Sequence, residues 1–211
     1  MPRVLIVDDH PIVRMGLRAM LEQAPGFEVC GEAGSTTEAL RPLSAQNPDV
    51  TLLDLMLDGC GGADFVTECL HACPRTRILV LSQHDEALYA ERVLKAGAHG
   101  YLMKGEALEG VVDALETVLR GDIAVSARMN ARLLAQRFRG PTDERYAELS
   151  NREMQIFLLI GAGRSTDAIA AELCLSTKTV GAHRENIKTK LDLESAAELE
   201  REALLHVERL G

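Results

Sequence analysis

The sequence of 211 residues contains no tryptophan, and aromatic residues make up only 3% of it. Single-stranded nucleic acids stack their bases on aromatic rings, so this mode of binding is not indicated. The chain also has no apolar run near the roughly 20 residues that a membrane helix needs. Its first segment, MPRVLIVDDH, has too few apolar residues for a signal-peptide core. We therefore expect a soluble, cytoplasmic protein that does not contact a membrane.

The chain has little cysteine and no surplus of basic charge. Its five cysteines form an odd set without a CxxC pair, which predicts reduced thiols rather than a disulfide or metal site. The net charge of −9 is unusual for a DNA-binding protein, because DNA is held mainly by Lys and Arg. A hydrophobic content of 46% is nevertheless enough to bury a core in each of two modest domains. The cysteines are Cys30, Cys60, Cys69, Cys73 and Cys174.

Short apolar runs alternate with longer segments of helical period between Arg3 and about Arg120. The runs are VLIVDD, FEVCGEA, VTLLDL, RILVLS and HGYLMK, and they are rich in Val, Leu and Ile. In the segments between them, apolar residues recur every three or four positions. This pattern predicts five βα units, and therefore a doubly wound α/β domain over residues 1–120 whose parallel sheet is covered on both faces.

Only helical signals remain after Gly121. Residues 121–146 are interpreted as a linker with one short helix near Ser126 to Phe138. Residues 147–211 predict a small all-α domain of four short helices, because each helical segment follows a residue that can cap it. The capping residues are Ser150 with Glu153 as a capping box, Ser165 or Thr166, Ser176 or Thr177, and Ser195.

Five polar residues follow or end the predicted strands, at the edge where open parallel sheets bind ligands. Asp8 and Asp9 are expected to end the first strand, and Asp54, Ser82 and Lys104 the third, fourth and fifth. Two carboxylates 4 Å apart repel by roughly 4 kcal/mol at an effective dielectric constant near 20, so we expect a cation between them. Carboxylate oxygens without a His or Cys companion favour Mg²⁺. Asp54 is then a candidate nucleophile for a phosphoryl group, with Lys104 and Ser82 bonding to its oxygens.

Residues 1 to about 120 resemble the receiver domain of two-component response regulators, on the motifs LIVDDH, LLDL, VLS and GYLMK and on their spacing. The resemblance implies the strand order 2-1-3-4-5 and a sensor histidine kinase that donates its phosphoryl group to Asp54. It also implies that Mg²⁺ is held by Asp9, Asp54 and the backbone carbonyl of Met56, with Asp8 nearby, often through water.

The same resemblance assigns further roles around the phosphoacceptor. Ser82 and Tyr101 match the family's pair that rearranges on phosphorylation, although Tyr101 could also be a strand aromatic that only packs. Met56 and His84 stand where the family tunes the lifetime of the phosphoryl group. A haloacid-dehalogenase-type phosphohydrolase is disfavoured, because such enzymes need a second acid at the position that Met56 occupies here.

The segment from Leu149 to Leu193 resembles the LuxR-type (NarL/FixJ-like) helix-turn-helix domain, on the words LSNRE, IA..L.LS.KTV and H...I..KL. The resemblance implies that the helix at 176–191 enters the major groove of promoter DNA. On a helical wheel Val180, Ile187 and Leu191 form its buried side. The candidate DNA contacts are Lys178, Thr179, Gly181, Ala182, His183, Glu185, Asn186, Lys188 and Thr189.

Individual roles follow from residue type and from position on this helix. Lys178 and Lys188 are expected to contact phosphates, and Glu185 could accept a hydrogen bond from a cytosine amino group. His183 lies at the edge of the buried side, so a packing role or one phosphate contact is expected.

Residues 147–211 carry eight basic and eleven acidic residues, which predicts weak binding by a monomer and favours a homodimer. An apolar stripe on the last helix could pair with a copy of itself, or it could be buried against its own domain. The stripe consists of Leu199, Ala203, Val207 and Leu210.

Together these features predict a transcriptional regulator that is not an enzyme and whose activity depends on phosphorylation. Its expected partners are a sensor histidine kinase and double-stranded promoter DNA, with RNA polymerase as a further candidate. The alternative is a receiver protein whose helical domain binds another protein, so that the chain acts as an antagonist or a phosphate sink.

Overall fold

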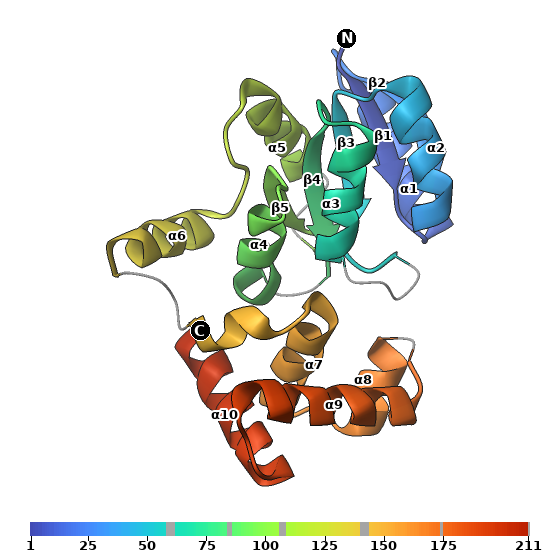
Figure 1. The fold of residues 1–211 in the computed structure, drawn as a ribbon. Helices are drawn as coiled ribbons and strands as arrows, with labels where there is room; N and C mark the ends of the chain where they lie inside the picture. The colour runs from blue at the N-terminus through green and yellow to red at the C-terminus, as the bar shows by residue number, and fades with distance from the viewer. Residues whose placement is uncertain (58–61, 84–85, 106–108, 140–143, 174, 211) are drawn as a thin grey trace. The chain divides into compact units, whose positions relative to one another are not determined.

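The computed structural model describes residues 1–57, 62–83, 86–105, 109–139, 144–173 and 175–210. The chain forms two compact units, Met1–Ala131 and Arg132–Gly211, and each has its own buried core (Figure 1). Among the described residues Cys30, Cys69 and Cys73 form no disulfide, and Cys60 and Cys174 lie outside the described residues. None of the helices among the described residues is long and apolar enough to span a membrane.

The first unit is built on a five-stranded sheet in which all neighbouring strands are parallel. The strand order is β2-β1-β3-β4-β5, which confirms the predicted doubly wound sheet. The central strands are almost fully buried, because helices cover both faces and their Val, Leu and Ile side chains meet no water. The strands are β1 Arg3–Val7, β2 Glu28–Ala33, β3 Val50–Asp54, β4 Arg77–Ser82 and β5 Gly100–Met103.

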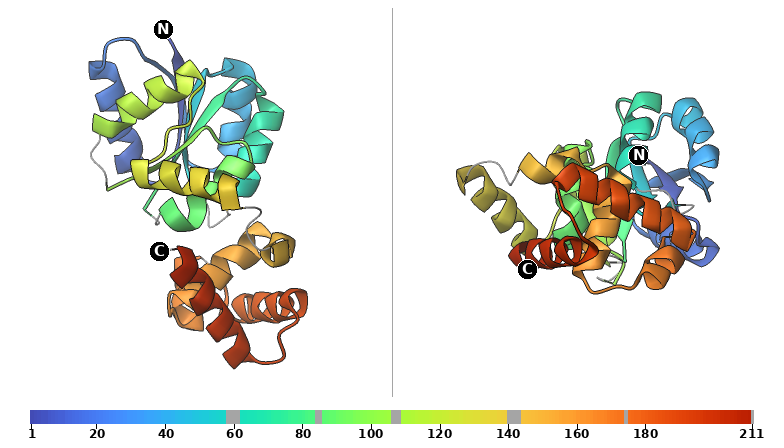
Figure 2. Two further views of the ribbon diagram at one scale, coloured as in Figure 1. Left: turned by 90° about the vertical axis from the view of Figure 1, so that its left-hand side faces the viewer. Right: turned by 60° about the horizontal axis from the view of Figure 1, so that its bottom comes forward.

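Helices form the outer layers of this unit, with α1 and α5 on one face of the sheet and α2, α3 and α4 on the other (Figures 1 and 2). On the face covered by α1 and α5, alternate strand residues such as Ile6 and Leu52 pack with Leu17 and Leu115. Burying each such side chain stabilises the fold by about 1.5–3 kcal/mol. The helices are α1 Pro11–Gln23 and α5 Glu109–Arg120 on this face, and α2 Thr36–Gln46, α3 Gly62–Ala72 and α4 Glu86–Lys95 on the other.

After α5 the chain returns to the edge of the sheet beside β5. Ala124 forms a parallel bridge with Gly100, and its carbonyl accepts a hydrogen bond of 2.8 Å from the Tyr101 amide. A Cβ at Gly100 would lie only 2.7 Å from that carbonyl oxygen, so glycine permits the close approach. The next helix, α6 Ala127–Arg139, matches the helix predicted in the linker, and its first residues belong to the first compact unit.

The second unit contains the four predicted helices, preceded by a short 3₁₀ helix, η2 Glu144–Glu148. Ser150 and Glu153 form the predicted capping box at the start of the first helix. Ser165 and Ser176 cap the next two, and the Ser195 hydroxyl accepts a bond of 3.1 Å from the amide of Glu198 in the last. The helices are α7 Asn151–Gly161, α8 Thr166–Glu172, α9 Thr177–Leu191 and α10 Ala196–Leu210.

Helix α10 packs closely on α7 through the stripe that was a candidate dimer surface. Leu199 and Ala203 are fully buried within the unit. A Cβ at Gly161 of α7 would overlap the Ala203 carbonyl and crowd Val207, so the two helices touch at this glycine. Of the two interpretations of the stripe, burial against its own domain holds for Leu199 and Ala203, while Val207 is partly buried and its role in a dimer stays a prediction. The side chain of Leu210 lies outside the described residues.

Candidate functional site

Three of the predicted residues meet at the carboxyl ends of β1, β3 and β5. The Lys104 Nζ lies 2.7 Å from Asp8 Oδ2 and 2.8 Å from Asp54 Oδ2. The three side chains are nearly enclosed, with exposed fractions of 12% for Lys104, 2% for Asp8 and 5% for Asp54. The parallel sheet therefore brings two carboxylates and one ammonium group from distant parts of the sequence into one buried cluster.

The charges in this cluster do not balance, because two acids face one lysine. Burial raises the pKa of Asp54 above its ordinary value, Lys104 opposes this shift, and the charge of Asp8 adds to it. The pKa of Lys104 is also raised, since the bonds to Asp54 and Asp8 outweigh the effect of burial. Lys104 thus stays charged at neutral pH, and the remaining negative charge would be relieved by a divalent cation.

Ser82 and Tyr101 lie on the two strands next to this cluster. Ser82 ends β4 and Tyr101 lies on β5, and both are almost completely buried. The Lys104 amide donates a hydrogen bond of 2.6 Å to the Ser82 carbonyl, which fixes the end of β4 beside the lysine. The burial of Tyr101 is consistent with packing, and the switch role of the pair stays a prediction.

The loop after β3 holds one residue with a predicted role in the lifetime of the phosphoryl group. The Met56 amide donates to Asp54 Oδ1 at 3.3 Å, so this peptide lies directly beside the acceptor. His84, the other predicted lifetime residue, lies outside the described residues. Both lifetime roles stay predictions.

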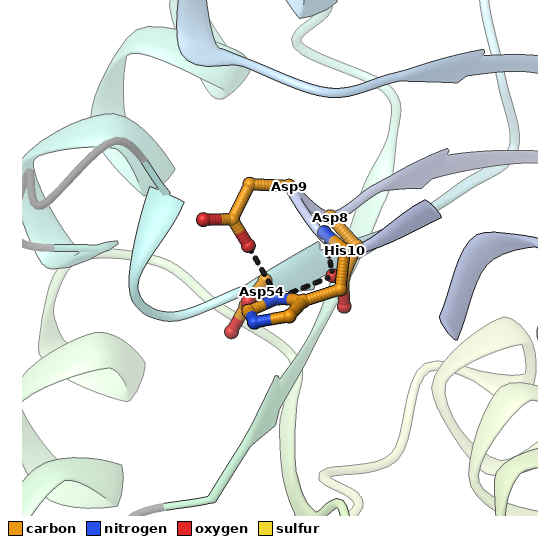
Figure 3. Close-up of side chains that lie close together, drawn as sticks. All are labelled: Asp8, Asp9, His10 and Asp54. Carbon is orange, nitrogen blue, oxygen red and sulfur yellow. Dashed lines mark hydrogen bonds and ion pairs between the residues drawn. The ribbon is translucent and has the colours of Figure 1, made fainter. Parts of the chain in front are cut away.

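His10 also belongs to the cluster, which the sequence interpretation missed. Its Nδ1 lies 2.6 Å from Asp9 Oδ1 and 3.3 Å from Asp8 Oδ1, and its amide donates to Asp8 Oδ1 at 2.8 Å (Figure 3). The expectation that the carboxylates have no His companion was wrong. His10 is the extended residue before α1, whose start is set by Pro11, and its ring reaches back to the acids. The adjacency of Asp-Asp-His in the sequence was the signal that could have revealed it.

The predicted carboxylate ligands lie close enough together to share a single ion. Asp8, Asp9, His10 and Asp54 each offer a ligand atom, and these atoms lie within 4.8 Å of one another. Three carboxylates are the hard oxygen donors that suit Mg²⁺. The donor set therefore fits the predicted cation, with one nitrogen in addition to the expected oxygens.

Helix α9 has the predicted division between a buried and an exposed side. Val180, Ile187 and Leu191 are buried. Five candidate DNA contacts are exposed, and the remaining four are partly buried. The exposed ones are Lys178, Ala182, Glu185, Asn186 and Thr189; the others are Thr179, Gly181, His183 and Lys188.

Most basic side chains of α9 already have acidic partners. Lys188 pairs with Glu185 at 2.8 Å on the same helix. Arg184 pairs with Glu200 on α10 at 2.9 Å, and Lys190 pairs with Glu153 on α7 at 2.7 Å. Within the described part of the chain, Lys178 is the basic residue of α9 for which no ion pair is found. The helix therefore offers DNA less free positive charge than its composition indicates.

His183 lies on α9 between the two sides. Its Nδ1 is buried and has no hydrogen-bond partner among the described residues. This position agrees with the predicted edge of the buried side, and the choice between packing and a phosphate contact stays open.

Comparison with known sequences gives matches to both units. Residues 4–116 match the family model of the response regulator receiver domain, and residues 147–203 match that of the bacterial regulatory proteins of the luxR family. Response regulator GacA of Pseudomonas protegens is 36% identical over 206 residues, which cover 98% of this chain and 97% of GacA.

Solved structures of RcsB from Salmonella enterica serovar Typhimurium are similar over nearly the whole chain. RcsB bound to promoter rprA with the phosphomimetic BeF₃⁻ is 25% identical, with a TM-score of 0.61, and the match covers 95% of this chain and 96% of that one. A structure of two RcsB dimers bound to two parallel DNAs is 26% identical, with a TM-score of 0.58 and the same coverage of both chains.

The raised pKa of Asp54 predicts how the stability of the first unit changes with pH. The folded state holds the Asp54 proton at pH values where the unfolded chain has already lost it, so stability falls as the pH rises above the ordinary value of 3.8. Asp54→Asn removes this loss. In metal-free buffer at pH 7 the variant should have a larger free energy of unfolding than the wild type, and the difference should shrink toward pH 4.

Urea denaturation followed by circular dichroism at a series of pH values measures this difference. Asp113→Asn is the matched control, because Asp113 is an exposed residue of α5 and its replacement should change little. A wild type that is more stable than Asp54→Asn at pH 7 would show that the bond to Lys104 outweighs burial.

Proposed function

Because the chain belongs to the response regulators, with a receiver domain and a LuxR-type DNA-binding domain, we propose that phosphorylation of Asp54 controls its binding to promoter DNA. The observation that carries the proposal is the buried cluster of Asp8, Asp54 and Lys104 at the carboxyl edge of the sheet. In this proposal the chain is a regulator and not an enzyme. It works in the cytoplasm, where promoter DNA lies.

The phosphoryl donor in this proposal is a phosphohistidine of a sensor histidine kinase. An Asp54 oxygen forms a bond to phosphorus, and the bond between phosphorus and the kinase nitrogen breaks. Lys104, which already contacts Asp54 Oδ2, compensates part of the added charge. Asp9, Asp54 and the Met56 carbonyl would hold Mg²⁺ with Asp8 nearby, and the ion would neutralise charge on the phosphoryl oxygens.

The input to the protein is then the conversion of the singly charged Asp54 carboxylate into an acyl phosphate that carries a charge of about −2. Such a charge cannot stay in a nearly closed site without a rearrangement of the groups around it, because the neighbours are themselves acidic. Ser82 and Tyr101, on the adjacent strand ends, are the residues proposed to rearrange. This step links the chemistry at β3 to the far edge of the sheet.

The start of the linker helix is held by the strand and helix next to this switch. Glu86, in the first turn of α4, accepts a hydrogen bond of 2.8 Å from the Ser126 amide and a second bond from the Ser126 hydroxyl. That hydroxyl in turn accepts from the Met129 amide at 3.0 Å, so Ser126 caps α6. Glu86 stands four residues after Ser82. We therefore include this Glu86–Ser126 contact in the path from Asp54 to the linker.

The output surface in this proposal is the exposed side of α9. Lys178 provides the free positive charge near the start of the helix, and Asn186 and Thr189 are exposed farther along it. The RcsB structures support the proposal, since that protein is described as bound to promoter DNA and as dimers on DNA. Weak binding by a single acidic domain favours a homodimer here too. A contact with RNA polymerase stays a prediction.

The Glu185–Lys188 pair favours a second candidate function, in which the helical unit binds a protein. Glu185 is exposed on the proposed DNA-facing side and neutralises one of its lysines. An acidic residue in this place weakens attraction to phosphates but suits a basic protein surface.

The acceptor assignment predicts that Asp54→Asn abolishes labelling by acetyl phosphate in the presence of Mg²⁺. The carboxylate oxygen is the nucleophile, and an amide cannot replace it. Intact-protein mass spectrometry detects the added phosphoryl group. Asp113→Asn should be labelled like the wild type, whereas labelling of Asp54→Asn would refute the acceptor role.

The DNA-binding assignment predicts opposite effects of two changes on α9. Lys178→Ala should weaken binding to all duplexes and reduce the slope of log affinity against log salt by about 0.9, because one phosphate contact is lost. Glu185→Gln should tighten binding, since it releases Lys188. Arg201→Ala, on an exposed position of α10, is the charge-matched control.

Fluorescence anisotropy with labelled duplexes, phosphorylated protein and several salt concentrations measures these effects. If neither the wild type nor Glu185→Gln binds random or promoter DNA at low salt, the protein-binding alternative is favoured instead.

The transmission path predicts that Glu86→Gln weakens the coupling between phosphorylation and DNA binding. The ratio of DNA affinities with and without phosphorylation should fall toward one, while Asp54 is still labelled. The same titrations on both forms give this ratio. Glu91→Gln is the matched control, because Glu91 is also on α4 but pairs with Lys95 of the same helix at 2.7 Å. Equal ratios for the two variants would exclude Glu86 from the path.

A further inference from the structure

His10 is the member of the acidic cluster that the proposed function leaves unused. Its side chain is 59% exposed, while its Nδ1 contacts Asp9 at 2.6 Å and Asp8 at 3.3 Å. Figure 3 shows the ring against the carboxylates of Asp9 and Asp8, with Asp54 beside it. No capping bond from the side chain to α1 is found, so the ring is not engaged in holding the helix start.

The oxygens of Asp8 divide the cluster into two sides. Oδ2 faces Lys104 at 2.7 Å, whereas Oδ1 faces the Nδ1 and the amide of His10. A cation on the Oδ1 side can therefore approach Asp8 and Asp9 without displacing Lys104. On that side the imidazole nitrogen is already among the possible ligand atoms, all within 4.8 Å of one another.

A nitrogen donor changes which cations the cluster prefers. Mg²⁺ binds oxygen ligands almost exclusively and keeps several waters. Imidazole is a better ligand for first-row transition metals, and a mixed set of nitrogen and oxygen donors favours them over Mg²⁺. We propose that His10 supplies a nitrogen ligand to the cation at this site, and that it gives the site a preference for transition-metal ions such as Mn²⁺ over Mg²⁺.

This inference deepens the proposed function, because it concerns the metal ion at the same phosphoacceptor. Binding at Nδ1 requires the neutral ring with its proton on Nε2, so the present contact with Asp9 Oδ1 is exchanged for a bond to the metal. The remaining ligands are the carboxylates already assigned. His10 thus determines the choice of cation, while Asp54 stays the acceptor.

Electron spin-echo modulation of bound Mn²⁺ tests the nitrogen ligand directly. With no phosphoryl donor present, the wild type should show modulation from a directly bound ¹⁴N nucleus, and His10→Ala should lose it. His71→Ala is the matched control and should keep the signal, because His71 is an exposed residue of α3 outside the cluster. The experiment uses the full chain without a histidine tag.

Calorimetric titrations with Mn²⁺ and Mg²⁺ test the preference. Loss of the imidazole should lower Mn²⁺ affinity by about tenfold or more and leave Mg²⁺ affinity nearly unchanged. His10→Gln, whose amide is a poor ligand for Mn²⁺, should behave like His10→Ala, and circular dichroism checks that both variants fold.

Two results would overturn the inference. One is ¹⁴N modulation that persists in His10→Ala. The other is a rise in Mg²⁺ affinity with unchanged Mn²⁺ affinity, which would mean that His10 competes with the cation rather than binding it. Because no phosphorylation is involved, these results are independent of whether Asp54 accepts a phosphoryl group.

Discussion

The buried ammonium group of Lys104 between Asp8 and Asp54 is the interaction on which the first unit depends. Asp8 and Lys104 are 96 positions apart in the sequence, so their contact requires the completed sheet. Removing the lysine would leave two buried acids without a counter-charge, and such a loss typically costs about 3–5 kcal/mol. The lysine follows β5 but contacts residues of β3 and β1, so its side chain must pass over β4.

The same arrangement makes the site responsive. One lysine cannot neutralise two buried acids, and burial raises the pKa of Asp54 despite the contact with Lys104. A bound cation would reduce the net negative charge of this cluster, and a phosphoryl group would increase it. The surrounding residues would have to adjust to either change. The stability of the sheet and the chemistry of the site therefore rest on the same three charges. A fully compensated cluster would be more stable but would have less reason to bind a cation.

Residue patterns along the chain were sufficient to predict the strands, their order and the helix caps, because these depend on local chemistry and on a resemblance with specific motifs. They were also sufficient to place Asp8, Asp54 and Lys104 at one edge. They were insufficient for His10, because the direction of a side chain just beyond a strand depends on the turn into α1. The stripe of Leu199 and Ala203 was ambiguous for another reason: periodicity shows that a face is apolar but not what covers it.

The number of basic residues on the helical unit likewise does not show how many of them are free to bind DNA. The four basic residues of α9 suggest a surface for DNA, but Arg184 and Lys190 hold α9 to α10 and α7 through Glu200 and Glu153. Burial acts to raise the pKa of Glu153, but bonds from Lys190 and from Ser150 lower it overall, so this carboxylate is a firm partner. Arg184 and Lys190 therefore stabilise the packing of the helices rather than provide free charge for DNA. Some of the acidic residues of this unit, such as Glu153 and Glu200, are thus the partners that hold its helices together.

The start of α6 is held within the first unit by residues next to the proposed switch pair. The Ala124 carbonyl accepts a hydrogen bond from the amide of Tyr101, and Ser126 is bonded to Glu86, which stands four residues after Ser82 in the sequence. Both residues of the proposed switch pair therefore lie within a few bonds of the segment that begins the linker helix. Gly100 is what allows that segment to lie against β5, since a side chain there would collide with Ala124. The proposed rearrangement at Asp54 thus needs no long path through the core, because the residues proposed to respond to it lie beside the groups that hold the first turn of α6.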